Sequence, residues 1–188
     1  MSHFLLPRTL SNSIVEEITD PIVENEYVKM FEHGQIYSIS LHDLIPLYSI
    51  QEGRTLITGE EPSGLYSIIL DTTESCTLDI LNHQEPNGCY LSKLSNTTQP
   101  SSIQYLYKLA CCYKKVYLCK PDHDCQTSST KYVIAMHYLH SPEKGNLKIP
   151  YYFRMKLEDI HSILGQIQLE HLRFKGTLGK NINLSYGS

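Results

Sequence analysis

Two residues of opposite charge lie at or near the ends of predicted strands and could act together in catalysis. Asp71 follows the apolar run Leu65–Leu70, and Lys93 lies within the run Cys89–Leu94. A lysine held beside a carboxylate in a partly buried cleft can act as a general base when its pKa is lowered. The structural alternative is an aspartate that caps the next turn and a lysine that extends to water. The pattern alone favours this alternative, because such pairs often have only a structural role.

Strands and helices alternate along the chain, which predicts an α/β layered sheet. Apolar or alternating runs predict strands at residues 36–41, 54–58, 65–70, 89–94, 115–119 and 132–136. Capping residues and helical spacing predict helices at 11–18 and 156–174, and another that opens at Pro100 and Ser101. A second short helical stretch is expected at 22–31, and a short helix or a turn at 42–48. Asn87-Gly88 predicts a turn before the strand at 89–94. The strands at 115–119 and 132–136 are joined by a loop and predict an antiparallel edge pair on a mostly parallel sheet.

The 188 residues fit a single domain, residues 1–188, which is long enough to bury a core without metals or disulfides. We divide it into a helical N-terminal segment at 1–34, a sheet core at 35–140 and a C-terminal helical extension at 141–188. The six cysteines form no CxxC pair and follow no signal peptide, which predicts reduced thiols in a cytoplasmic protein without a zinc site. No apolar run approaches ~18 residues, so no membrane span is expected.

The net charge of −4 argues against a strongly basic nucleic-acid surface. Lys108, Lys114, Lys115 and Lys120 form the single local concentration of basic residues in the sequence. They are either a solvated face or a weak patch that contacts phosphates. The run Asp122–Cys125 has metal-binding residue types, but a polar loop is the favoured interpretation and no metal is predicted.

Five segments follow the order and spacing of the motifs of one enzyme family. They are an aspartate-bearing strand at Tyr66–Asp71, a lysine-bearing strand at Gly88–Leu94, a helix at Ser101–Cys112, an aromatic-x-K-V-x-x-x-K-P signature at Tyr113–Pro121 and an S-E-x-Y element at Ser128–Val133. Together they resemble the FtsJ-like RNA 2'-O-methyltransferases that modify caps and ribosomal RNA. The resemblance covers about half of the chain, and its most specific parts are the Lys-Pro signature and the Ser-x-x-Tyr element.

The resemblance implies an altered active site. The family surrounds the ribose 2'-hydroxyl with Lys, Asp, Lys and Glu, and its second lysine removes the proton. By this resemblance Asp71 is the aspartate and Lys93 is the second lysine. Thr130 stands at the glutamate position, Cys125 stands at an arginine-bearing position, and no upstream residue matches the first lysine. The resemblance therefore implies a degenerate catalytic centre.

The resemblance also implies that the cofactor site is missing. Family members bind S-adenosylmethionine on a glycine-rich turn after the first strand, where only glycine lets the backbone approach the ligand. The glycines before Leu70 are isolated, at positions 34, 53, 59 and 64, and only Gly59–Glu61 could replace part of such a loop. The stretch before Asp71 is also short for a complete first half. We therefore predict a Rossmann-like methyltransferase sheet with an incomplete first half and no cofactor.

These departures predict a pseudoenzyme, a methyltransferase-fold protein that binds or scaffolds within a viral or RNA-processing assembly. Its expected partners are another protein or a second copy of the chain, in the cytoplasm or in a virion, and a large-DNA-virus origin would fit the divergence. The first alternative is an active S-adenosylmethionine-dependent RNA cap 2'-O-methyltransferase that uses Lys93 as base and Asp71 as its electrostatic partner. The second is a non-catalytic RNA-binding protein that uses the basic residues between Lys108 and Lys120.

Overall fold

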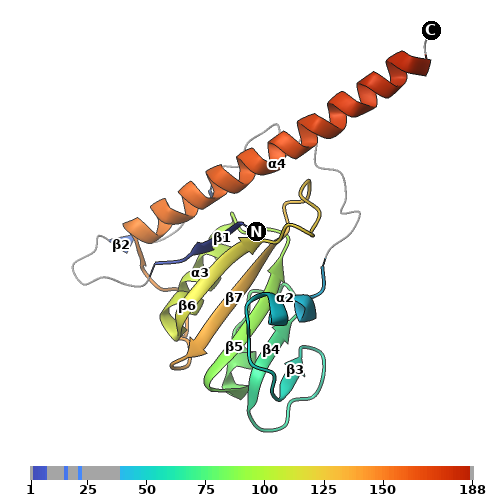
Figure 1. Ribbon diagram of the computed structural model, residues 1–188. Coiled ribbons are helices and arrows are strands. Elements are labelled where there is room, and N and C mark those ends of the chain that lie inside the picture. The colour runs from blue at the N-terminus through green and yellow to red at the C-terminus, as the bar shows by residue number, and fades with distance from the viewer. Residues whose placement is uncertain (1, 8–14, 17–20, 23–38, 187–188) are drawn as a thin grey trace.

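The fold is built on a six-stranded mixed sheet (Figure 1). The computed structural model describes residues 2–7, 15–16, 21–22 and 39–186, and it describes side chains as far as residue 174. The strand order is β1 (Ser2–Leu5), β6 (Tyr113–Lys120), β7 (Lys131–Tyr138), β5 (Gln84–Leu94), β4 (Tyr66–Asp71) and β3 (Thr55–Ile57). The prediction of an α/β sheet is confirmed.

The sheet is less parallel than the sequence predicted. Among the described strands, β3, β4 and β5 run parallel, whereas β5 with β7, β7 with β6 and β6 with β1 are antiparallel pairs. The antiparallel pairing of β6 with β7 is confirmed, but this pair is not at the edge. β7 lies between β5 and β6, and β1 covers the far side of β6.

Helices cover both faces of the sheet. The helices α3 (Pro100–Cys112) and α4 (Tyr151–Tyr186) pack on one face, with Tyr90, Val116 and Val133. The short helix α2 (Leu41–Leu47) packs on the other face, with Ile68, Leu91 and Ile134. Because neighbouring residues of a strand point to opposite faces, these two cores follow the alternation of each strand.

Local signals fix several of these elements. A capping box starts α2, because Ser40 Oγ accepts from the His42 amide and the Asp43 side chain accepts from the Ser40 amide. Pro100 occupies the first turn of α3, where its missing N–H has no cost. The predicted helices at 42–48 and from Pro100, and the strands at 54–58, 65–70, 89–94, 115–119 and 132–136, are confirmed.

The described residues of the N-terminal segment differ from the predictions made for it. The helix predicted at 11–18 is wrong at its two described residues, because Val15–Glu16 forms β2, antiparallel to β8 (Ile149–Pro150). The segment 1–34 also contains β1. The strand predicted at 36–41 is wrong at Leu41, where α2 begins, and its residues 36–38 lie outside the described residues. The helix predicted at 22–31 also lies outside them, apart from Ile22, which is buried in the core on the α3 side.

The C-terminal helix is longer than predicted. The prediction was residues 156–174, but α4 begins at Tyr151, directly after β8, and ends at Tyr186. In Figure 1 it runs diagonally across one end of the sheet and extends past it. Within the described residues, no helix combines the length and hydrophobicity that a membrane crossing requires. All six cysteines are free thiols.

The predicted turn at Asn87-Gly88 is an irregularity inside β5. Asn87 has a φ of 64°, and the pairing of β4 with β5 changes register at this point. Tyr66 pairs with Gln84, but Ile68 pairs with Cys89, so β5 advances five residues while β4 advances two. The difference is three residues, which is an odd number. Each residue of β5 after this point therefore points to the opposite face from the one it would occupy in a regular pairing.

Candidate functional site at the carboxyl edge of the sheet

Asp71, the predicted catalytic aspartate, ends β4 and is buried, with 3% of its surface exposed. Its side chain points to the face covered by α3. Oδ1 accepts from the Thr73 amide at 3.0 Å and from the Thr73 hydroxyl at 2.7 Å, and Oδ2 accepts from the Tyr90 hydroxyl at 2.5 Å. Both oxygens of this carboxylate are therefore engaged by the protein itself.

A relay of buried hydroxyls continues from Asp71 into the core. Because the single proton of the Tyr90 hydroxyl goes to Asp71, Tyr105 donates to Tyr90 at 2.6 Å and Ser92 donates to Tyr105 at 2.7 Å. Burial raises the pKa of both tyrosines well above the usual value, so both remain protonated donors. Neither Tyr90 nor Tyr105 could be selected from the sequence, because fourteen tyrosines are spread along the chain.

Lys93 does not lie beside Asp71. In the sheet it pairs with Tyr132 of β7. Leu91, two residues earlier on the same face of β5, belongs to the core on the α2 face. Asp71 instead pairs with Ser92, the residue that points to the α3 face. The predicted catalytic pair therefore lies on opposite faces of the sheet.

Lys120 forms a second buried network at the same edge. Its Nζ donates to Asp124 Oδ2 at 2.8 Å and to the Thr130 carbonyl at 2.7 Å. Asp124 Oδ1 also accepts from the Tyr132 hydroxyl and from the Ile39 amide, both at 3.1 Å. Asp124 has no exposed surface, and the side chain of Lys120 is 7% exposed. The Lys-Pro signature and the Tyr of the Ser-x-x-Tyr element are thus joined through Asp124, which the sequence analysis treated only as part of a polar loop.

The other predicted basic residues lie elsewhere. Lys114 and Lys115 are exposed at the start of β6 and, as neighbours in a strand, point to opposite faces. Lys120 ends the same strand, about 17 Å away at ~3.3 Å per residue. Lys108 is half-buried on α3. The four lysines do not form one surface patch, and the described residues hold no cluster of metal-ligating side chains, Asp122–Cys125 included.

The helix α4 closes this edge over the loops that follow β5 and β6. The Nε2–H of His161 donates to the Thr97 carbonyl at 3.1 Å and lies 3.2 Å from the Thr97 hydroxyl. Further along α4, Gln168 Nε2 donates to the Thr127 carbonyl at 3.0 Å. Burial, assisted by the charge of Lys131, lowers the pKa of His161 to about 4, so the imidazole is neutral near pH 7.

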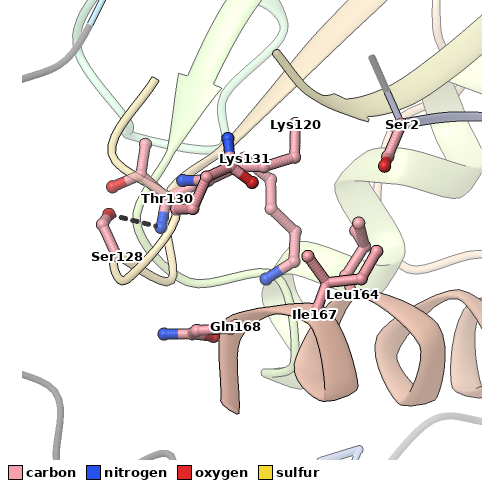
Figure 2. Close-up of a pocket in the computed structure, with 9 residues that line it drawn as sticks. Ser2, Lys120, Ser128, Thr130, Lys131, Leu164, Ile167 and Gln168 are labelled. Carbon is pink, nitrogen blue, oxygen red and sulfur yellow. Dashed lines mark hydrogen bonds between the residues drawn. The ribbon is translucent and has the colours of Figure 1, made fainter. Parts of the chain in front are cut away.

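Little space remains under α4. Figure 2 shows the residual cavity between Lys120, Thr130 and Lys131 on the sheet side and Leu164 and Ile167 on the helix. Its volume is about 10 Å³, which is room for about one water molecule. In open α/β sheets ligands bind outside the carboxyl ends of the strands. Among the described residues, α4 lies over this location at the ends of β5 and β6.

The glycine turn that could replace part of a cofactor loop also lies at this edge. Gly59 follows β3 with a φ of 101°, and Thr58 Oγ1 accepts from the Thr72 amide at 2.8 Å. A Cβ at Gly59 would meet nothing within 4 Å, so glycine is needed here for the backbone angle.

Among the described residues, larger cavities lie at the opposite, amino edge. One of about 580 Å³ is lined by the segment before β3 and by the first half of β5, with Glu52, Arg54 and Glu85. Another of about 350 Å³ lies between the end of α3 and the loop after β7, with Lys108 and Lys148. Neither Asp71 nor Lys93 lines either cavity. No family model and no curated protein matches the sequence.

Proposed function

We propose that this chain is a non-catalytic binding or scaffold module built on a methyltransferase-like α/β sheet. One observation carries the proposal: α4 covers the loops after β5 and β6 at the carboxyl edge of the sheet, the edge where such folds bind their ligands. The helix makes its closing contacts with buried side chains, His161 and Gln168, that are 9% and 6% exposed.

The networks beneath α4 support the same conclusion. A general base must reach the proton that it removes, and an electrostatic partner must lie close to it. Asp71 is held by Thr73 and Tyr90, and Lys93 lies on the other face of the sheet. Asp71 therefore serves as a structural connection between β4, the loop after it and β5.

The proposed partners are another protein or a second copy of the chain, in a cytoplasmic or virion assembly. An active RNA cap 2'-O-methyltransferase is the competing proposal, and it requires the edge under α4 to open for S-adenosylmethionine. Titration calorimetry with S-adenosylmethionine, and separately with S-adenosylhomocysteine, distinguishes the two. We expect no heat of binding at millimolar ligand from protein whose circular dichroism shows it to be folded.

Binding of S-adenosylmethionine with a micromolar Kd, a binding free energy of about −8 kcal/mol, would overturn the proposal under one condition. Asp71→Asn must abolish this binding, and the exposed control Asp159→Asn must leave it intact. Methyl transfer to capped RNA that is lost in Lys93→Ala would overturn it as well. Asp159 is a suitable control because it is an exposed α4 residue, outside the networks at this edge.

A further inference from the structure

The cavity at the end of α3 brings together charged residues from two distant segments. It is lined by Lys108 and Cys112 of α3 and by His140, Glu143 and Lys148 of the loop that follows β7. Its volume of about 350 Å³ lies within the range of small-molecule sites. It is at the amino edge of the sheet, away from the edge that α4 closes.

Hydrogen bonds hold the two walls of this cavity in place. The Gln104 side-chain amide makes two bonds to Leu147, donating to its carbonyl at 2.6 Å and accepting from its amide at 3.0 Å. Lys108 lies one helical turn after Gln104, and Lys148 follows Leu147, so the two lysines are set beside the same junction. The Leu139 amide adds a bond to the Cys112 carbonyl at 2.8 Å.

The charges in the cavity favour an anion. Within the described part of the chain, neither Lys108 nor Lys148 makes an ion pair, and Glu143 is the single carboxylate in the lining. Burial raises the pKa of Cys112 to about 12, with smaller effects from Cys111 and Glu143 in the same direction and from Lys108 against it. Lys108, Cys112 and Glu143 all line this cavity.

His140 also lines the cavity. Its Nδ1 lies 3.0 Å from the Ser141 carbonyl, which can only accept, so Nδ1 carries a proton. In the neutral ring the other nitrogen, Nε2, is then an acceptor, so it can bind a hydroxyl group of a ligand. The larger cavity at this edge differs in charge, because Glu52 and Glu85 line it and its Arg54 already donates to the Leu65 carbonyl.

We propose that the cavity lined by Lys108, His140 and Lys148 binds a phosphate-bearing ligand of nucleotide size. Lys108 and Lys148 come from two separate segments, which Gln104 joins through its bonds to Leu147. Their ammonium groups suit a phosphate, whose oxygens form strong charge-assisted hydrogen bonds with lysine. The phosphate belongs either to a free nucleotide or to RNA. The proposal does not depend on the chain being non-catalytic, because it concerns the opposite edge of the sheet.

The test uses the full chain and titration calorimetry with AMP, ATP, inorganic phosphate, and an RNA oligonucleotide with either a 5'-phosphate or a 5'-hydroxyl. Lys108→Ala and Lys148→Ala should each weaken binding by about tenfold or more, because each removes a bond to a charged group. Glu143→Gln should strengthen it, because a repelling carboxylate is lost. Lys156→Ala, which removes an exposed lysine from α4, should leave it unchanged.

The same titrations identify the source of the phosphate. Binding of AMP, or of the 5'-phosphorylated oligonucleotide alone, supports a terminal phosphate, whereas equal binding of both oligonucleotides with steep salt dependence supports the RNA backbone. The proposal is overturned if none of these probes binds at millimolar concentration. It is also overturned if Lys156→Ala weakens binding as much as Lys148→Ala, since the effect would then reflect only the overall charge.

Discussion

Replacing Asp124 by asparagine should be among the most destabilising single changes at the carboxyl edge. Asp124 is fully buried and accepts from Lys120 Nζ, the Tyr132 hydroxyl and the Ile39 amide. Asparagine keeps the shape but removes the charge, so the Lys120 ammonium remains buried beside only the Thr130 carbonyl. Removing one partner of a buried ion pair usually costs about 3–5 kcal/mol, because the other charge loses its compensation.

Urea denaturation monitored by circular dichroism and tyrosine fluorescence would measure this loss, since the chain has fourteen tyrosines and no tryptophan. In thermal denaturation the same change should lower Tm by about 6–20 °C for a domain of this size. Asp159→Asn, an exposed α4 change outside this network, is the matched control and should alter stability by less than about 0.5 kcal/mol. A loss below about 1 kcal/mol for Asp124→Asn would refute the role assigned to this network.

Four further changes test other parts of the structure. Burial lowers the pKa of His161 to about 4, so as the pH falls this histidine is protonated in the unfolded chain before it is protonated in the folded chain. About 3 kcal/mol of the free energy of unfolding, which is present above pH 6.5, should therefore be lost as the pH falls toward 4. In His161→Gln, urea denaturation at pH 7 and pH 4.5 should show a smaller difference than in the unmodified chain. Gly88→Ala should destabilise the fold by about 1–3 kcal/mol, because the new Cβ would lie 2.8 Å from the Ser67 carbonyl oxygen. Gly165→Ala in α4 has open space around the new Cβ and should stabilise the fold by about 0.5–1 kcal/mol. Thermal unfolding should therefore show Tm shifts of opposite sign for the two variants. Tyr105→Phe should cost about 1–2 kcal/mol in urea denaturation, because it breaks the hydroxyl relay to Asp71, and an unchanged midpoint would contradict that relay.

Five of the six strands of the main sheet, all except β1, could be predicted from sequence because their signals are local. The run Leu65–Leu70 is apolar almost throughout, as a central strand requires, and it forms β4. By contrast, the helical spacing of residues 14–18 suits a helix as well as a strand. Val15–Glu16 is a strand through its pairing with Ile149–Pro150, and the local sequence carries no signal for so distant a partner.

The candidate site could be predicted only as positions along strands. The sequence placed Asp71 at a strand end correctly, but the face to which Lys93 points depends on the register shift near Asn87. Without that odd shift, Lys93 would share the face of Asp71. Similarly, the closure by His161 and Gln168 depends on where α4 crosses the sheet, which is a tertiary property that helical spacing does not determine.

The pairing of β1 with β6 has a consequence for how the chain folds. Ser2–Leu5 is made well before its partner Tyr117–Lys120, so this contact raises the contact order and closes one of the longest loops in the described structure. Until then, the strand and its partner both expose unpaired peptide groups. Such open edges can pair with another chain, so slow or incomplete docking of β1 would favour aggregation of the nascent protein.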